Sequence, residues 1–179
     1  MHRDRLLSRV VIGIALAVCG ALPARAQIAW TNYTSGSGLG NNIVFGVYAA
    51  GSTIYAATTG GLSISTNSGA NWTNYTTGNG LANNGVRGVY AAGSTIYAAT
   101  SGGLSISTDS GANWTNYTTG NGLANNGVNG VYAAGSTIYA ATNGGLSVGI
   151  QAVPEPSTYA LALAGLACGG WHLRRRRRA

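Results

Sequence analysis

The sequence predicts an all-β repeat protein, and two observations carry this prediction. A unit of 42 residues recurs almost letter for letter, with its copies beginning at Trp30, Trp72 and Trp114. A fixed period of this size is typical of repeat architectures, in which each unit buries its apolar face against its neighbours. The units consist mainly of Gly, Ser, Thr, Asn and Ala, with Tyr, Trp, Leu, Ile and Val at intervals. This composition favours short strands joined by tight turns over helices.

Alternating apolar residues and turn residues place four strands in the second repeat. The expected strands are Val86 to Ala91, Thr95 to Thr100, Leu104 to Ser107 and Trp114 to Thr118. Four short antiparallel strands in about 42 residues match the size of one β-propeller blade. We therefore expect residues 27–150 to form a β-propeller-like array of about three four-stranded blades.

The two ends of the repeat region are complementary. The region opens with a strand of the fourth type, Trp30 to Thr34, and closes with one of the third type, Leu146 to Ile150. Pairing the first strand beside the last would complete the third blade and remove two exposed edges. Three blades are nevertheless fewer than the usual four to eight. Either two chains share a six-bladed ring, or the blades form an open arc, or the architecture is another all-β stack. We expect some self-association into a homo-oligomer.

Residues 1–26 have the pattern of a secretory signal peptide. A basic start precedes the apolar run Val10 to Leu22, and Ala24 and Ala26 supply an A-x-A cleavage site for signal peptidase. This apolar run is short for a permanent transmembrane helix. The alternative is a lipoprotein signal that uses Cys19.

The composition changes after the last repeat. Residues 151–158 form a proline-rich linker that cannot continue a sheet, because Pro154 and Pro156 lack a backbone donor. Residues 159–179 are apolar at first and end in a cluster of five arginines, Arg174, Arg175, Arg176, Arg177 and Arg178. An apolar segment with a basic end predicts a transmembrane helix whose basic end stays in the cytoplasm. Its short apolar length suits a transient anchor.

Three parts of this tail occur in a specific order: the motif Val153-Pro154-Glu155-Pro156-Ser157, the apolar segment and the arginine cluster. In this combination the tail resembles the PEP-CTERM sorting signal of Gram-negative bacteria. The resemblance implies recognition by an exosortase, which would cleave near the Pro-Glu-Pro motif. An inner-membrane intermediate would then be released to the cell surface or to an exopolysaccharide matrix. A plain C-terminal anchor with a proline-rich spacer is the alternative.

A short motif marks the turn before the fourth strand of two repeats. Ser107, Asp109, Gly111 and Trp114 match the pattern S-x-D-x-G-x-x-W. The preceding copy has the same pattern with asparagine in place of aspartate, at Ser65, Asn67, Gly69 and Trp72. The motif resembles the Asp-box, or BNR, repeat. We interpret it as structural: the Asp or Asn side chain accepts backbone hydrogen bonds, Gly takes the unusual dihedrals and Trp packs between blades.

The repeats are also similar to those of two-component-regulator propellers. The likeness lies in the segments Gly80-Leu81 to Val86 and Gly102-Gly103-Leu104. It implies a β-propeller fold, in agreement with the strand pattern.

The charge is concentrated outside the repeats. Of a formal net charge of +7, the repeat region holds only Arg87 and Asp109, which cancel. A nucleic-acid partner is therefore not expected, because phosphate neutralisation needs Lys and Arg on the folded surface. The repeats contain no His, Cys, Lys or Glu, so they offer no metal ligands, carboxylate pair or activated nucleophile. We predict no catalytic residues, no metal and no cofactor, and hence no enzyme.

Two positions differ among otherwise matching copies. One is occupied by Phe45, Arg87 and Asn129, and the other by Thr59, Ser101 and Asn143. On the propeller interpretation they lie near the innermost strand and in the turn after the second strand. They are the candidate ligand positions, and drift at tolerant surface positions is the alternative.

Together these features predict an exported cell-surface or matrix protein with a structural or adhesive role. The alternative is a carbohydrate- or ligand-binding module, with exopolysaccharide as a candidate partner.

Overall fold

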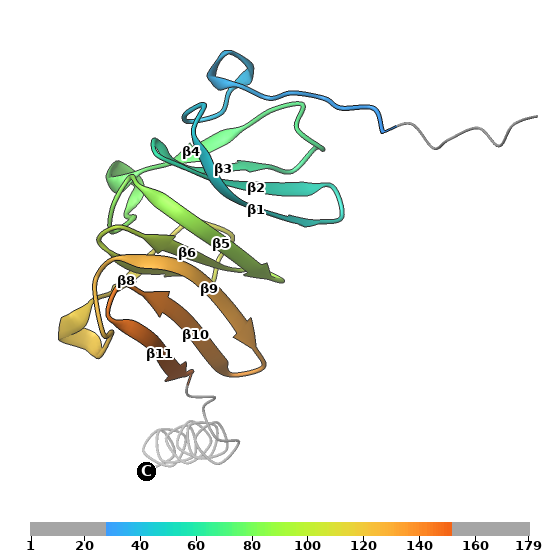
Figure 1. The fold of residues 1–179 in the computed structure, drawn as a ribbon. Helices are drawn as coiled ribbons and strands as arrows, with labels where there is room; N and C mark the ends of the chain where they lie inside the picture. The colour runs from blue at the N-terminus through green and yellow to red at the C-terminus, as the bar shows by residue number, and fades with distance from the viewer. Residues whose placement is uncertain (1–27, 152–179) are drawn as a thin grey trace, which may run out of the picture. The chain divides into compact units, whose positions relative to one another are not determined.

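The fold was obtained as a computed structural model, which describes residues 28–151 (Figure 1). Residues 28–31 carry no regular secondary structure, and a compact unit begins at Asn32. The unit contains three antiparallel sheets. The first comprises β1 (Val44–Ala50), β2 (Thr53–Thr58), β3 (Gly61–Ser65) and β4 (Thr73–Tyr75). The second comprises β5 (Val86–Ala92), β6 (Thr95–Thr100), β7 (Gly103–Ser107) and β8 (Thr115–Tyr117). The third comprises β9 (Val128–Ala134), β10 (Thr137–Thr142) and β11 (Gly145–Ile150).

Within each sheet the strands pair in chain order through tight hairpins, which confirms the predicted blade-like meander. A short 3₁₀ turn precedes the first strand of every sheet: η1 (Ser35–Ser37), η2 (Thr77–Asn79) and η3 (Thr119–Asn121). Each turn begins after a threonine in extended conformation and ends at a glycine with a left-handed backbone, such as Gly80 with φ of 107°. Only glycine adopts such a φ without steric cost.

The three sheets are stacked in the order of the sequence. β1 packs beside β5, and β5 packs beside β9 (Figure 1). One core lies between the first and second sheets, where Tyr55, Leu62 and Ile64 meet Val86 and Ala91. A second core lies between the second and third sheets and contains the equivalent residues Tyr97, Leu104, Ile106, Val128 and Ala133. The first strand of each blade therefore covers the second and third strands of the blade before it.

Two details differ from the sequence-based expectation. Trp114 precedes β8 and is not part of it, because its side chain packs against the core between the first and second sheets. The strand expected at Trp30 to Thr34 is not formed among the described residues, and the third sheet has only three strands there. The ring of Tyr33 instead lies against Trp72, which directly precedes β4 of the first sheet. The second sheet stands between the first and the third, so β11 is out of reach of Tyr33 in the same chain.

The predicted signal peptide, sorting motif and C-terminal helix lie outside the described residues. Within residues 28–151, no helix has the length and apolar character needed to cross a membrane.

Candidate functional site

The position occupied by Phe45, Arg87 and Asn129 is the β-bulge of each blade. In the second sheet Val86 pairs with Thr100 and Gly88 pairs with Ala99, which leaves Arg87 as the extra residue. The register skips at the same place in the other two sheets. A bulge leaves one residue unpaired and redirects its side chain, and bulges are common beside functional sites. Because β1, β5 and β9 are neighbours, the three bulge residues form one row across the blades.

The two variable positions meet in a hydrogen-bonded network. Arg87 Nε donates to Ser101 Oγ at 3.2 Å, and Arg87 Nη1 donates to Asn129 Oδ1 at 2.5 Å. Asn129 Nδ2 then donates to Asn143 Oδ1 at 2.8 Å. The sequence identified these residues only as variable. The structure shows that the variable residues of the second and third blades contact one another.

Phe45 differs from the other two bulge residues. Its side chain is 57% exposed, whereas Arg87 is half-buried. An exposed aromatic side chain thus stands at the first-sheet end of the row, and amide groups stand at the third-sheet end. This arrangement offers an apolar contact surface beside hydrogen-bonding groups.

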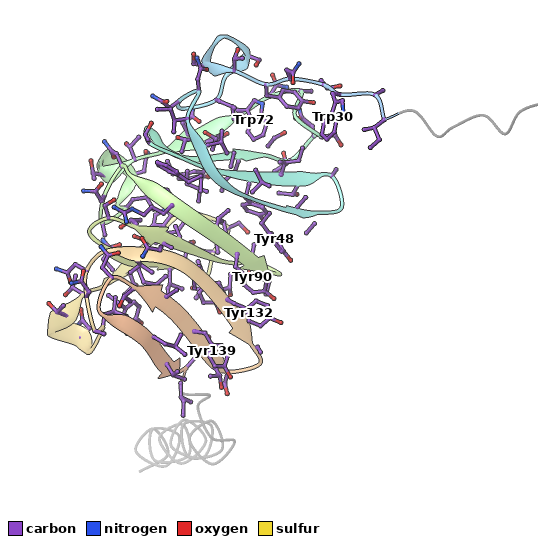
Figure 2. The ribbon with its side chains drawn as sticks, in the orientation of Figure 1. Trp30, Tyr48, Trp72, Tyr90, Tyr132 and Tyr139 are labelled. Atoms are coloured by element: carbon purple, nitrogen blue, oxygen red, sulfur yellow. The ribbon has the colours of Figure 1, made fainter. Side chains whose placement is uncertain are left out.

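A second row, made of tyrosines, also follows β1, β5 and β9 (Figure 2). The ring centroid of Tyr90 lies 5.1 Å from that of Tyr48 and 4.9 Å from that of Tyr132. Tyr90 also approaches Tyr97 on the neighbouring strand, at 6.1 Å. Desolvation, followed by the proximity of Tyr132 and Tyr48, raises the pKa of Tyr90 above 10.0. Tyr90 therefore stays a neutral phenol at physiological pH.

The residues of the Asp-box-like motif in the second blade close the hairpin between β7 and β8. Ser107 Oγ donates to Asp109 Oδ1 at 2.8 Å, and Gly111 N donates to Ser107 Oγ at 2.8 Å. Asn113 contributes two further donors to Asp109: its backbone N at 2.8 Å and its Nδ2 at 2.7 Å. These hydrogen bonds lower the pKa of Asp109 to about 2, with the Asn113 side chain as the largest cause. The carboxylate is thus held ionised and turned toward its own hairpin.

The first blade closes the same hairpin with an amide. Asn67 Oδ1 accepts from Ser65 Oγ at 3.0 Å and from Asn71 N at 2.9 Å. Gly69 N donates to Ser65 Oγ at 2.8 Å, as Gly111 does in the second blade. The hairpin therefore needs an oxygen acceptor at this position and not a charge.

The tryptophan at the end of each motif packs on a tyrosine from the preceding repeat. The ring of Trp114 lies 5.9 Å from that of Tyr75, and Trp72 lies 5.5 Å from Tyr33, both edge to face. Each indole also covers the glycine that ends the preceding 3₁₀ turn. A Cβ on Gly38 or Gly80 would lie 3.4 Å from the Cβ of Trp72 or Trp114 respectively.

Sequence reasoning did not find a cavity that the structure shows in the described part of the chain. It has a volume of about 360 Å³ and lies between the second and third sheets. Its walls include Leu104, Tyr117, Gly122, Leu123 and Val148. The corresponding space between the first and second sheets is filled by Trp114.

The described residues hold little that could perform acid–base or metal chemistry. Their two charged side chains, Arg87 and Asp109, are both bound in the networks above. No group of three or more His, Cys, Asp or Glu side chains comes together within residues 28–151.

Comparison with protein families gives two matches. The family model described as the DUF6242 beta propeller domain matches residues 26–160, which is most of the chain. The model of the PEP-CTERM protein-sorting motif matches residues 152–178. No curated protein matches this sequence. The expected propeller and the expected sorting signal are thus both confirmed, and the chain is an exported exosortase substrate with a β-propeller domain.

One solved structure supports the fold, and two others are reported with it as similar. An extracellular domain described as that of the hybrid two-component system BT4673 from B. thetaiotaomicron superimposes with a TM-score of 0.51 at 16% identity, over 62% of this chain and 17% of that chain. The equivalent domain of BT3049 from the same organism gives a TM-score of 0.49 at 21% identity, over 62% and 15%. An ancestral GH74 enzyme gives a TM-score of 0.42 at 23% identity, over 66% and 20%. The chain thus spans about a sixth to a fifth of the length of these proteins.

Proposed function

Because the chain belongs to the DUF6242 β-propeller family and carries a PEP-CTERM sorting motif, we propose that it is a non-catalytic structural or adhesive protein of the bacterial cell surface or extracellular matrix. Signal peptidase would remove residues 1–26. Exosortase would cleave near Pro154-Glu155-Pro156 while residues 159–179 hold the chain in the inner membrane. The three-sheet domain would then be released to the outside, with exopolysaccharide as its surroundings.

One observation carries the non-catalytic part of this proposal. The described domain has two charged side chains, and hydrogen bonds hold both in place. General acid–base catalysis needs a group whose proton affinity is tuned near the working pH and that can reach a substrate. Asp109 has a pKa of about 2, and its carboxylate accepts three hydrogen bonds from its own hairpin. It is suited to holding a turn closed and poorly suited to moving a proton.

Deletion and sorting variants test the proposal together. Cells with the gene deleted should lose adhesion or matrix cohesion, and the wild-type gene should restore it. A chain with Glu155→Ala and Pro156→Ala should be exported but keep its tail, and it should fail to restore the phenotype because it stays at the inner membrane. A matched chain with Ser136→Ala, an exposed turn substitution, should restore it fully. Full restoration by the sorting variant would overturn the proposed site of action.

The bulge row supports a second candidate function, a carbohydrate-binding surface. Planar amides and a guanidinium suit hydroxyl groups, and an exposed aromatic ring suits the apolar face of a sugar. Phe45, Arg87 and Asn129 provide these groups in one row. If the row binds the matrix polysaccharide, Phe45→Ala should weaken retention of the exported protein on that polysaccharide at least tenfold. Retention equal to wild type would leave the purely structural role.

A further inference from the structure

The two end sheets of the stack expose the residues that the repeats bury everywhere else. We call Val44 and Val47 on β1 the leading face; they are 40% and 72% exposed. We call Tyr139, Leu146 and Val148 on β10 and β11 the trailing face; they are 38%, 65% and 57% exposed. In the middle of the stack the equivalent residues form the cores. Leu62, Leu104, Val86 and Val128, for example, are all at most 3% exposed.

The leading face matches the trailing face because the same contact already occurs twice within the chain. β5 covers Tyr55, Leu62 and Ile64 of the first blade, and β9 covers the equivalent residues of the second. β1 carries nearly the same sequence as β5 and β9. We propose that two copies of this chain bind through two equivalent contacts. In each contact the leading face of one copy packs on the trailing face of the other, so that the two chains complete one ring of six sheets. This assembly goes beyond the proposed function.

Three glycines mark where the second copy fits. A Cβ on Gly46 would lie 3.1 Å from the carbonyl oxygen of Arg87, and one on Gly88 would lie 3.2 Å from that of Asn129. Each first strand is thus pressed closely against the next. At the equivalent Gly130, no described atom comes within 4 Å. This site is open to the backbone of β1 in another copy.

The edge of the third sheet shows the same relation. Gly61 lies directly beside the carbonyl oxygen of Tyr75, and Gly103 beside that of Tyr117, because β4 and β8 pair there. The equivalent Gly145 has no described atom within 4 Å of its Cβ position. The third sheet is therefore ready to accept a fourth strand along β11.

The segment that fits this edge is the first described stretch of the chain. By the 42-residue repeat, Thr31 to Tyr33 corresponds to β4 and β8. In β4, Asn74 accepts a hydrogen bond from Ser63 at 2.6 Å and donates to the carbonyl of Gly38. In β8, Asn116 makes the same two contacts with Ser105 and Gly80. The same register would bring Asn32 of one copy to Ser147 and Gly122 of the other.

The cavity beside β11 has the properties of a tryptophan site. Gly122 forms part of its wall and, unlike Gly38 and Gly80, has no described atom within 4 Å of its Cβ position. Trp72 and Trp114 cover those other two glycines. Trp30, the equivalent residue, is 81% exposed (Figure 2). In the assembly, Trp30 of the second copy would occupy this cavity and pack on Tyr117, as Trp114 packs on Tyr75.

Pairing would not disturb Tyr33. Its ring already meets Trp72 as that of Tyr75 meets Trp114, and its hydroxyl donates to the carbonyl of Ser68 at 3.0 Å. Tyr75 keeps its tryptophan contact while its backbone pairs with Leu62. Tyr33 can likewise keep Trp72 while pairing with Leu146 of the other copy.

Ring closure with two chains follows from the number of blades. A head-to-tail interface closes into a ring when its rotation permits, and otherwise continues as a filament. Propellers have four to eight blades, and two copies supply six sheets. Closure also removes the unpaired edge of β11, which would otherwise invite uncontrolled strand addition.

The rival occupant is the chain's own continuation. By the same repeat count, Pro156 to Tyr159 stands where Trp114 to Tyr117 stands in the second blade. Pro156 supplies neither the indole nor a backbone donor. The N-terminal segment of a second copy has both, so it is the better match to this edge.

Paired cysteines test the proposal in the processed chain recovered from the cell surface. Thr73 pairs with Ile64 and Thr115 with Ile106, so Thr31 should face Val148 of the other copy. A chain with Thr31→Cys and Val148→Cys should run as a covalent dimer on a non-reducing gel and as a monomer after reduction. Chains with either substitution alone are the controls and should give no dimer. A monomer under both conditions would overturn the proposal, because it is the result of pairing within one chain or of an edge covered by the chain's own tail. A ladder of larger species would overturn it as well.

A charge on the trailing face provides a second test that places no strain on the fold. Leu146→Asp adds a charge to an exposed side chain, and the exported protein should change from dimer to monomer in native mass. Ala134→Asp lies on the same sheet, at a position exposed in all three blades, and should leave the dimer intact. A dimer in both variants would show that the trailing face is not the interface.

Discussion

The second and third sheets have nearly the same sequence but different surroundings. Leu104 and Ile106 on β7 are 3% and 7% exposed, whereas Leu146 and Val148 on β11 are 65% and 57% exposed. The second sheet is covered on one side by the first and on the other by the third, and the third has a neighbour on one side only. In a stacked repeat, each unit contacts only its neighbours. The burial of a residue is thus decided by the position of its repeat in the stack.

The largest expected contrast is between two leucines at the same repeat position. Leu104→Ala shortens a buried side chain and should lower the free energy of unfolding by about 2–5 kcal/mol. Leu146→Ala should change it by less than about 0.5 kcal/mol in protein diluted enough to separate the copies. Urea unfolding of the exported protein measures both. Equal losses would mean that the third sheet is as well covered as the second.

The tyrosine row gives a smaller contrast. Tyr90 contacts Tyr48, Tyr97 and Tyr132, whereas Tyr132 ends the row and is 56% exposed. Edge-to-face and tilted pairs each contribute about 0.5–1.5 kcal/mol beyond burial. Tyr90→Ala should therefore destabilise the domain by about 3 kcal/mol, and Tyr132→Ala by clearly less. Thermal unfolding of the two variants side by side checks the order, and a larger loss at Tyr132 would contradict it.

The β3–β4 and β7–β8 hairpins differ in their expected response to pH. Hydrogen bonds to the ionised form hold the pKa of Asp109 at about 2 in the folded protein, below its unfolded value of about 4. Its contribution to stability is therefore complete above pH 4 and is lost as the pH falls through 2. Asp109→Asn copies the acceptor that Asn67 provides in the first blade. We expect the thermal unfolding midpoint of the wild type to decrease as the pH is lowered from 4 to 2. The midpoint of the variant should decrease less over the same range.

A matching substitution in the first blade provides the control for this prediction. Asn67→Asp should introduce a second acid-sensitive hairpin and steepen the same decline. A variant with Asp109→Asn whose decline equals that of the wild type would place the acid sensitivity elsewhere.

The bulge row should have the smallest effect on stability. The bonds from Arg87 to Ser101 and Asn129 lie at the surface, where such contacts contribute little net free energy. Arg87→Met should change the free energy of unfolding by less than about 1 kcal/mol. The same variant separates the two candidate functions. Unchanged retention on matrix polysaccharide favours the structural role, and a large loss with unchanged stability favours binding.

Most of the fold was predictable because the repeats agree with one another. Turn residues and alternation located four strands per unit, and β6 (Thr95–Thr100) was placed at its observed ends. The tail was recognisable because its three parts occur in order. The turn motif was also readable, since Ser107, Asp109 and Gly111 form one local hydrogen-bonded network.

The rest depends on contacts between distant residues. Sequence variation pointed to Phe45, Arg87 and Asn129, but only the strand register shows that they are bulge residues. The bond from Arg87 to Asn129 joins two blades, and no local pattern contains it. The strand expected at Trp30 to Thr34 needs a partner strand, and a single chain of three stacked sheets does not bring β11 to it. The cavity beside Gly122 has the same origin, because the tryptophan expected to fill it belongs to that strand.

The mass of the protein recovered from the surface of its own cells, measured first under native and then under denaturing conditions, tests this account most directly. Denatured, the chain should lack residues 1–26 and everything beyond the Pro-Glu-Pro region. Under native conditions the mass should be twice that of this processed chain. A chain that keeps Tyr159 to Ala179 would contradict the sorting, and a native mass equal to one chain would contradict the pairing of the two end sheets.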